Sequence, residues 1–276
     1  MLPISVAEFK QISQWLHDQC GLFLRDNQEY LVQTRLGRFT ENLGLSSFSE
    51  LNTLLRYAPE KYLSQVISLM TTNETLWFRD ESCWNALEKD ILPRLIQIQQ
   101  RTNKIMRVWV AGCSTGQEAY SLAILLDELC QKDIAKQFQI YAMDISQAAL
   151  ETAKAGRYNA LEMKRGLSPC RRDKYFEPDH QYWILRSDIR LRVQFDTINL
   201  THDFSRLGQF DLILCRNVTI YFTPETRQRI LLAMTKMLSE QGALLLGATE
   251  SVCGLTEINS SEFEGCIYLN AKIAVY

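Results

Sequence analysis

A pattern of strand, glycine turn and helix near the middle of the chain constrains the fold more than any other stretch. Residues 108–111 are apolar and β-prone, residues 112–116 form a turn of small residues, and an amphipathic helix begins near Gln117. Such a unit brings bare backbone against a nucleotide-like ligand at the carboxyl end of a strand. Gly112 and Gly116 lack the Cβ atom that would block this approach. The pattern predicts an α/β fold with a ligand site at the turn.

An acidic residue in the next strand–helix unit strengthens the prediction of a ligand site. The predicted strand at residues 139–144 ends in Asp144, where a carboxylate can accept hydrogen bonds from both hydroxyls of a ribose. The turn matches neither G-x-G-x-x-G nor G-x-x-x-x-G-K-[ST], so neither a dinucleotide nor a triphosphate cradle is indicated. An ordinary turn between strand and helix is the alternative, and the position of Asp144 makes it the weaker one.

Composition narrows the class of protein. A chain of 276 residues is long enough for two domains, and its net charge of −2 counts against a nucleic-acid-binding protein. The eight cysteines form no C-x-x-C pair and do not cluster with the three histidines, so we expect no metal site. No apolar run approaches the roughly 20 residues of a membrane span, and the N-terminus lacks a signal-peptide pattern. We therefore expect a cytoplasmic protein without direct membrane insertion.

The first 70 residues are predicted to be entirely helical. Capping-box spacing at Ser5 and Ser47 begins two of the four expected helices. Gly21 is a typical stop for the first of them, and the fourth begins at Pro59. We expect residues 1–72 to form a separate helical domain.

A basic group lies on and just before the second predicted helix, at residues 27–43. Arg35 and Arg38 lie on that helix, and Arg25 precedes it. These side chains form either a solvated basic face or a docking surface for an acidic partner. In the second case, their charge would set association rate and register more than affinity.

The remaining chain, residues 73–276, alternates strands with helices and is predicted to be one α/β domain. Strands are expected at residues 108–111, 139–144, 191–195, 210–215 and 243–247, with a last strand or hairpin at 263–276. Helices are expected at residues 81–100, from 117, from 147 to Gly156, and from Pro224 to about 240, with Gly242 as the stop of the last one. Residues 157–190 interrupt the alternation, and we expect a small β-rich insertion there.

Five stretches, in order along the chain, resemble motifs of the chemoreceptor glutamate methyltransferases, the CheR family. They are Thr-Asn-Glu-Thr-Leu-Trp-Phe-Arg at residues 72–79, Ala-Gly-Cys-Ser-Thr-Gly-Gln-Glu at 111–118, Ala-Met-Asp-Ile-Ser at 142–146, Cys-Arg-Asn-Val-Thr-Ile-Tyr-Phe at 215–222 and Leu-Gly-Ala-Thr-Glu-Ser at 246–251. The resemblance covers nearly the whole chain. It implies an N-terminal helical domain followed by a class I (Rossmann-like) S-adenosylmethionine methyltransferase domain with a small β-rich insertion.

The resemblance also implies a function. The cofactor would be S-adenosyl-L-methionine and the product S-adenosyl-L-homocysteine. The methyl group would pass to glutamate side chains in the cytoplasmic helical domain of chemoreceptors, giving methyl esters for chemosensory adaptation. The N-terminal domain would dock to the receptor.

Carried over residue by residue, the resemblance implies a set of cofactor contacts. Asn73 and Thr75 would hydrogen-bond the cofactor, and Arg79 would reach its methionine carboxylate as a bidentate fork. Glu118 would accept from its amino group, and Asn199 would lie on the adenine side. The full implied set is Asn73, Thr75, Arg79, Gly112, Glu118, Asp144, Asn199, Leu200, Arg216 and Asn217. The chain departs from the family pattern at three positions, which are Gln117, Ala119 and Ala248.

Methylation of a glutamate needs no general base, because a glutamate of pKa about 4.3 is already ionised at neutral pH. It needs groups that hold the carboxylate without leaving it buried and unpaired. Arg216 and Tyr221 follow the strand at residues 210–215 and are our candidates for this catalytic role. A structural ion pair is the alternative for Arg216, and a core aromatic is the alternative for Tyr221.

Two other functions are open. One is a methyltransferase for RNA or a small molecule. Base-amino methylation typically uses an Asp/Asn-Pro-Pro-aromatic stretch, whereas residues 216–221 contain no proline. The other is a receptor-bound adaptor without turnover, against which the intact Glu118, Asp144, Arg216 and Tyr221 argue.

The insertion also bears on how a receptor is held. Some CheR family members grip a short peptide at the receptor C-terminus with a longer, glycine-rich loop in this subdomain, by β-strand addition. Here residues 175–185 are short and lack glycine, and Pro178 removes a backbone donor. We therefore expect no C-terminal pentapeptide tether. The alternative is a different peptide groove at Tyr182 and Trp183.

Overall fold

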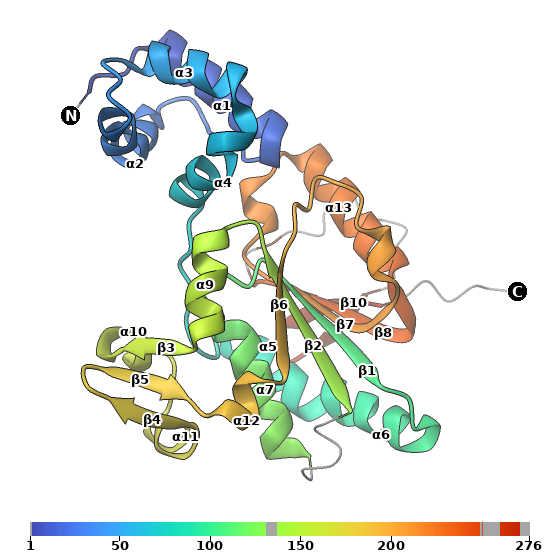
Figure 1. Ribbon diagram of the computed structural model, residues 1–276. Coiled ribbons are helices and arrows are strands. Elements are labelled where there is room, and N and C mark those ends of the chain that lie inside the picture. Colours follow the sequence, from blue (N-terminus) through green and yellow to red (C-terminus); the bar gives the residue numbers. More distant parts are fainter. Residues whose placement is uncertain (1, 131–136, 249, 251–259, 271–276) are drawn as a thin grey trace, which may run out of the picture.

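The computed structural model describes residues 2–130, 137–248, 250 and 260–270. Four helices form the N-terminal part, which stands beside the larger α/β part (Figure 1). They are α1 Val6–Cys20, α2 Glu29–Asn42, α3 Phe48–Tyr57 and α4 Pro59–Met70. The Ser5 side chain caps α1 by accepting a hydrogen bond from the Glu8 amide, and Gly21 ends the helix at a φ of 74°. These helices enclose an apolar core of their own, which confirms the predicted all-helical opening.

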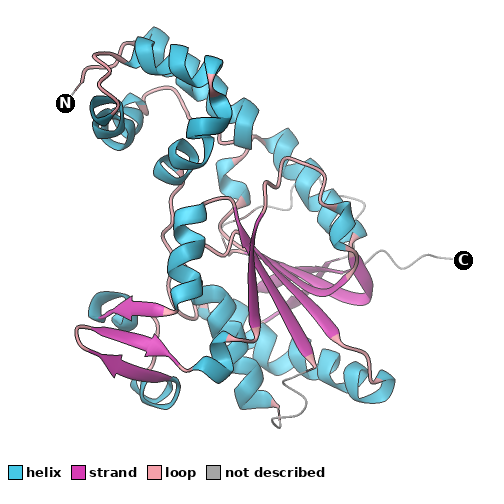
Figure 2. Cartoon of the chain, viewed as in Figure 1, coloured by secondary structure: helices cyan, strands magenta, loops and turns pink. Residues whose placement is uncertain are grey.

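The larger part is built on a central sheet, whose strands are magenta in Figure 2. This sheet has seven strands in the order β6-β2-β1-β7-β8-β10-β9. The strands are β1 Met106–Ala111, β2 Phe138–Asp144, β6 Val193–Thr197, β7 Phe210–Cys215, β8 Leu238–Leu246, β9 Ser260–Phe263 and β10 Cys266–Asn270. The five neighbouring strands β6, β2, β1, β7 and β8 are parallel to one another, whereas β10 and β9 run antiparallel to their neighbours. The strand order reverses at β1. Ligands of such sheets lie outside the carboxyl ends of the strands at this switch point.

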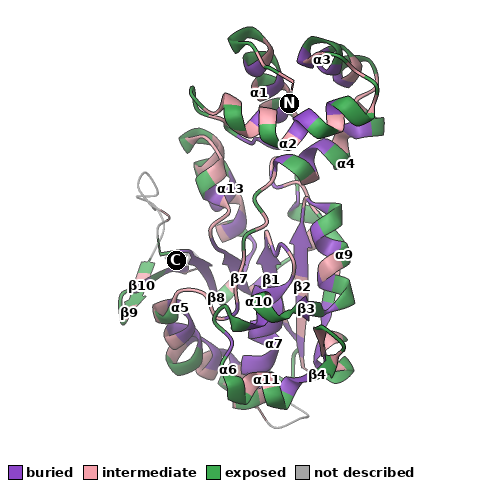
Figure 3. Ribbon diagram, turned by 90° about the vertical axis from the view of Figure 1, so that its left-hand side faces the viewer, coloured by how far each residue is buried: buried purple, intermediate pink, exposed green. Residues whose placement is uncertain are grey.

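Successive side chains of the central strands point to opposite faces of the sheet, and both faces are apolar. Helices therefore cover both faces. Val108 and Val110 of β1 face a core closed by α5, α6 and α7, whereas Trp109 and Ala111 face a core closed by α13. Figure 3 shows the central strands buried between these layers. The helices are α5 Glu81–Ala86, α6 Leu92–Thr102, α7 Gln117–Leu129, α9 Gln147–Ala155 and α13 Pro224–Lys236. None of the described helices is long and apolar enough to cross a membrane.

The insertion at residues 157–190 contains a three-stranded antiparallel sheet in the order β3-β5-β4. Its elements are β3 Arg157–Asn159, α10 Ala160–Lys164, α11 Pro169–Tyr175, β4 Phe176–Asp179, β5 Tyr182–Leu185 and α12 Ser187–Arg190. The expected strands are therefore present, and three short helices accompany them. An ion pair between Arg171 and Glu128 (2.7 Å) joins α11 to the end of α7.

Two helix boundaries differ from the sequence-based prediction. The helix expected at residues 81–100 is interrupted by a π-helical turn at Leu87–Ile91. The helix that begins at Pro224 ends at Lys236 rather than near 240, because β8 already begins at Leu238 and pairs there with Phe210. Gly242 therefore lies within β8 and does not stop a helix. Of the last predicted hairpin, residues 271–276 lie outside the described residues.

Candidate active site

A cavity of about 1000 Å³, measured to its open mouth, lies at the carboxyl ends of β1, β2 and β7. The end of α1 and the linker between the two parts of the chain complete its wall. All residues that the sequence predicted for the site line this cavity, namely Asn73, Thr75, Arg79, Gly112, Glu118, Asp144, Asn199, Leu200, Arg216, Asn217 and Tyr221.

The glycine turn after β1 forms the floor of the cavity. Gly112 and Gly116 have φ angles of 72° and 94°, in the left-handed region that favours glycine. A Cβ atom on Gly112 would also overlap the Val218 side chain. The amides of Gly112 and Cys113 donate to the Met143 carbonyl oxygen, at 2.8 and 3.1 Å. The turn is therefore fixed against the end of β2, and neither glycine can be replaced without strain.

Asp144 at the end of β2 is held in place by backbone amides. Its Oδ2 accepts from the Ser114 amide and its Oδ1 from the Ser146 amide, each at 2.8 Å. Burial raises the pKa of Asp144, and these amides partly oppose the shift. Each carboxylate oxygen has a second lone pair. The arrangement suits a carboxylate that accepts from two vicinal hydroxyls of a ligand.

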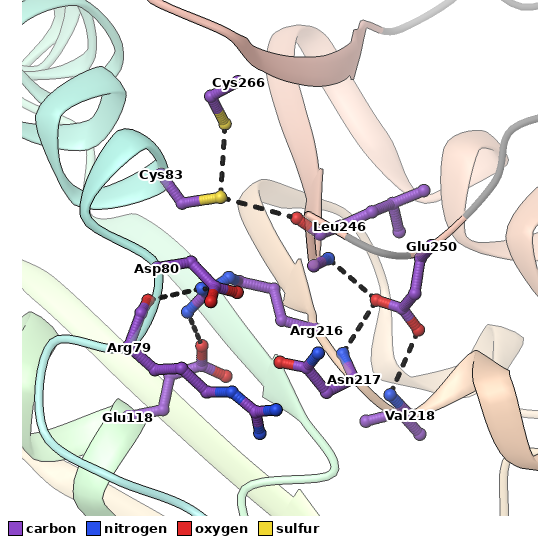
Figure 4. A network of polar contacts seen from close by, with 11 residues as sticks. Arg79, Asp80, Cys83, Glu118, Arg216, Asn217, Val218, Leu246, Glu250 and Cys266 are labelled. Atoms are coloured by element: carbon purple, nitrogen blue, oxygen red, sulfur yellow. Dashed lines mark hydrogen bonds and ion pairs between the residues drawn. The ribbon is translucent and has the colours of Figure 1, made fainter.

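A buried ion-pair network lies on the β7 side of the cavity (Figure 4). Arg216 Nη1 donates to Glu118, and Nη2 donates to Asp80 at 2.9 Å and to the Arg79 carbonyl oxygen at 2.5 Å. Burial raises the pKa of Glu118, although Arg216 opposes the shift. Burial works against the charge of Arg216, but the surrounding acids outweigh it and raise its pKa. The network fixes Glu118 at the start of α7.

These contacts show what the Arg216 side chain does within the protein. Its side chain is only 1% exposed, and both terminal nitrogens are engaged within the protein. The structure therefore shows the ion pairs that were the alternative for Arg216. A grip of the two terminal nitrogens on a substrate carboxylate would compete with these pairs. The buried Nε of Arg216, in contrast, makes no hydrogen bond with the described residues. Arg216 therefore holds Glu118 in place, and its expected role toward the substrate carboxylate stays a prediction.

Arg79 differs from Arg216 in having an uncommitted side chain. Its guanidinium lines the cavity and makes no hydrogen bond or ion pair with the described residues, and Figure 4 shows it apart from the Arg216 pairs. The flanking Phe78 and Asp80 have positive φ angles of 48° and 63°, which are rare for such residues. Strained backbone of this kind persists at functional sites when its surroundings over-determine it. The Arg79 guanidinium is available for an anionic ligand group.

The linker at residues 71–76 closes one side of the cavity. The Asn73 carbonyl oxygen accepts from Ser114 Oγ at 3.0 Å, and Asn73 Nδ2 donates to Ser146 Oγ at 3.4 Å. These contacts hold the linker against the two loops whose amides orient Asp144. Thr75 lies in the same wall of the cavity.

Arg35 secures this linker and is not part of an open basic face. Its guanidinium donates to the carbonyl oxygens of Met70 and Thr71, at 2.6 and 3.2 Å. Arg25 and Arg38 remain exposed. The basic surface expected on and before α2 is therefore smaller than the sequence indicated.

The wall opposite the linker contains Asn199, Leu200 and Tyr221. Asn199 Nδ2 donates to the Gln19 carbonyl oxygen at 2.8 Å, and its Oδ1 accepts from the Thr201 amide at 3.0 Å. The Asn199 carboxamide thus joins the two parts of the chain, and its contact with an adenine stays a prediction. Tyr221 is half-buried, and its hydroxyl makes no hydrogen bond with the described residues.

Several residues important to the site were missed by sequence reasoning. Asp80 pairs with Arg216, and the backbone amides of Ser114 and Ser146 orient Asp144. Glu250 accepts hydrogen bonds from the segment that follows Arg216. Asp80 and Glu250 lie in or next to the recognised motifs, which was the available signal. The described residues contain no group of three or more His, Cys, Asp or Glu side chains placed to hold a metal ion.

Two family models match the chain in succession. The model described as "CheR methyltransferase, all-alpha domain" matches residues 7–71, and "CheR methyltransferase, SAM binding domain" matches residues 73–264. Together they span almost all of the chain.

Full-length relatives agree with the family models. "Chemotaxis protein methyltransferase 1" of Pseudomonas aeruginosa is 39% identical, over 91% of this chain and 92% of that protein. "Chemotaxis protein methyltransferase Cher2" of Pseudomonas putida is 38% identical over the same shares. "Chemotaxis protein methyltransferase 1" of Vibrio cholerae is 38% identical, over 93% of each chain. The chain therefore belongs to the CheR methyltransferase family.

Proposed function

We propose that this protein transfers a methyl group from S-adenosylmethionine to glutamate side chains in the cytoplasmic helical domain of chemoreceptors. The products are glutamate methyl esters, which serve chemosensory adaptation, and S-adenosylhomocysteine. Family membership and the names of the relatives support the reaction and the receptor as substrate. The observation that carries the proposal is one cavity lined by three charged groups. They are the Asp144 carboxylate, which suits a ribose, the buried Glu118 carboxylate, and the Arg79 guanidinium, which makes no hydrogen bond or ion pair with the described residues.

The residues present fit S-adenosylmethionine, whose bound sulfonium would supply an electrophilic methyl group. Asp144 accepts from the ribose hydroxyls, while Asn199 and Leu200 lie on the adenine side. Glu118 accepts from the ammonium group, and Arg79 pairs with the carboxylate. The glycine turn provides the close backbone approach that a nucleoside needs.

The protein accelerates methyl transfer mainly by positioning the receptor glutamate. The receptor glutamate would accept the methyl group as an ionised carboxylate, so no proton would have to move. Opposite charges neutralise each other along this path, which a dry site favours over water. In-line positioning can supply about 7–11 kcal/mol in favourable cases. Tyr221, whose hydroxyl is uncommitted, is proposed to hold the carboxylate at the cavity mouth.

A parallel incubation tests the choice of substrate. The protein is incubated with methyl-labelled S-adenosylmethionine and either a receptor cytoplasmic fragment or RNA. We expect base-labile label on the receptor fragment and none on RNA, in keeping with the net charge of −2. Label on RNA alone would support the nucleic-acid alternative. Cofactor binding without any turnover would support a non-catalytic adaptor.

The domain roles and the location of the protein form part of the same proposal. Residues 1–72 are the receptor-docking domain and residues 73–276 the transferase domain, with the insertion at about 157–190. Exposed Arg25 and Arg38 provide the basic docking surface. The protein acts in the cytoplasm, where the receptor domain lies.

The insertion is not expected to bind a C-terminal pentapeptide of the receptor. The hairpin of β4 and β5 has a turn of only two residues, His180 and Gln181, and Pro178 lies in β4. Its short strands leave little edge for an added strand. We expect a receptor fragment to be methylated at the same rate with and without its last few residues. Micromolar binding of the free peptide, or a large fall in rate on truncation, would contradict this expectation.

A further inference from the structure

Glu250 accepts an unusual number of hydrogen bonds from one short segment (Figure 4). Its Oε2 accepts from the amides of Asn217 and Gly247, both at 2.7 Å. Its Oε1 accepts from the Val218 amide at 3.1 Å, and from the Thr219 amide and hydroxyl at 2.7 Å each. One carboxylate therefore binds three successive amides that directly follow Arg216.

The backbone of this segment is shaped to bind an anion. Asn217 has a φ of 58°, and Val218 follows in the right-handed helical region with φ −112° and ψ −47°. Successive residues of opposite handedness point their amides to one side, which makes a concave nest for an anion. A positive φ at an asparagine is strained and requires support from its surroundings. The Glu250 carboxylate fills the nest and provides this support.

The segment that donates to Glu250 also contributes to the wall of the cavity. Asn217, Val218 and Tyr221 line the cavity, whereas Glu250 does not. Val218 packs so closely over Gly112 that a Cβ atom there would overlap it. Glu250 therefore lies behind the cavity wall and acts on bound molecules mainly through the position of this wall. Its charge also helps to raise the pKa of Glu118.

We propose that Glu250 is a positioning residue for methyl transfer. Its carboxylate fixes residues 217–219 in the strained conformation that sets Val218 on the glycine turn. The short 3-10 turn Thr219–Tyr221 follows at once, so the same bonds help to place Tyr221 in the cavity wall. This inference rests on the proposed function, because it assigns to Glu250 the alignment of the substrate carboxylate.

The test compares Glu250→Gln with Glu262→Gln, an exposed glutamate of β9 that serves as the matched control. The glutamine is isosteric, but it is uncharged and turns an NH₂ group toward amide donors. We expect kcat at saturating S-adenosylmethionine to fall roughly tenfold or more, about 1.4 kcal/mol in the barrier. The Kd for S-adenosylhomocysteine should change by no more than about threefold, since Asp144 keeps its contacts. Loss of the Glu250 charge lowers the raised pKa of Glu118 and so favours the ionised form that accepts from the ligand. The control should keep the kcat of the parent.

Parent-like kcat in Glu250→Gln would overturn the inference, and so would a loss of kcat matched by an equal loss of cofactor affinity. If this variant does not fold, Thr219→Val decides, because it removes one hydroxyl donor and leaves the carboxylate in place. We expect a smaller fall in its kcat with an unchanged Kd, and parent-like kcat would overturn the inference. Parent protein that labels no receptor would instead overturn the proposed function, and with it this inference.

Discussion

Replacement of Asp144 by alanine probes the cofactor site at its best-defined residue. The carboxylate is 8% exposed and is oriented by the Ser114 and Ser146 amides. Alanine removes the proposed acceptor of both ribose hydroxyls and adds no group that could replace it. Because the methyl group of alanine cannot accept a hydrogen bond, water is the only substitute.

The expected magnitude follows from two charge-assisted hydrogen bonds. Each is worth about 1.5–3 kcal/mol, so their loss should weaken cofactor binding by about 3–6 kcal/mol. This corresponds to a rise in Kd of roughly 100-fold to 10,000-fold. The two amides left unpaired should also lower the free energy of unfolding by about 1–3 kcal/mol each. The variant should therefore fold with a reduced Tm and show no measurable cofactor affinity.

Titration calorimetry with S-adenosylhomocysteine, at a temperature well below the Tm of the variant, measures the effect. Asp196→Ala is the matched control, because Asp196 is exposed on β6 and pairs in register with Met143, the residue before Asp144. The control should bind as the parent does. Parent-like affinity in Asp144→Ala would refute our placement of the ribose.

Three further results are expected. Tyr221→Phe should lower kcat by about tenfold or more through loss of one hydroxyl contact, with the Kd for S-adenosylhomocysteine unchanged by calorimetry. Cofactor affinity should fall as the pH drops through the raised pKa values of Glu118 and Asp144, because their ionised forms are the acceptors, and a pH series of Kd values measures this. Gly112→Ala should lower the Tm much more than Gly44→Ala, since both have positive φ but only Gly112 lacks room for a Cβ atom.

Each of these expectations has a contrary result. A fall in cofactor affinity with unchanged turnover in Tyr221→Phe would indicate a structural tyrosine. A Kd that is independent of pH across the acidic range would show that neither carboxylate titrates with binding. Equal Tm shifts at Gly112 and Gly44 would show that the wall at Val218 yields to the added methyl group.

Local signals predicted the elements that carry the site. The apolar run before Gly112, the small-residue turn and the spacing to Asp144 depend only on neighbouring residues, and the structure places them as expected. Helix caps at Ser5 and Ser47 were likewise visible, because a cap needs only a side chain three residues from its amide.

Partners distant in the chain could not be predicted in this way. Arg216 pairs with Asp80 and Glu118, and Arg35 binds the linker, only because the order of strands and the packing of α2 bring them together. Sequence analysis could assign a charge to each residue but could not tell which charges meet. The partners of Arg216 could not be predicted for this reason.

Pairing between strands also determines where the helix that begins at Pro224 ends. Residues 238–241 suit a helix by propensity, and Gly242 is a plausible stop. In the structure, Leu238 is buried and pairs with Phe210 of β7, so the segment extends β8. Propensity is a weak preference that such pairing overrides.

The position of the transferred methyl group tests the central claim most directly. The parent protein is incubated with S-adenosylmethionine bearing a deuterated methyl group and with a chemoreceptor cytoplasmic fragment, and the receptor peptides are sequenced by tandem mass spectrometry. The account predicts deuterated methyl esters on glutamate side chains of the receptor, and none with Asp144→Ala. Label on lysine or on a backbone terminus, or an unlabelled receptor despite tight cofactor binding, would contradict it.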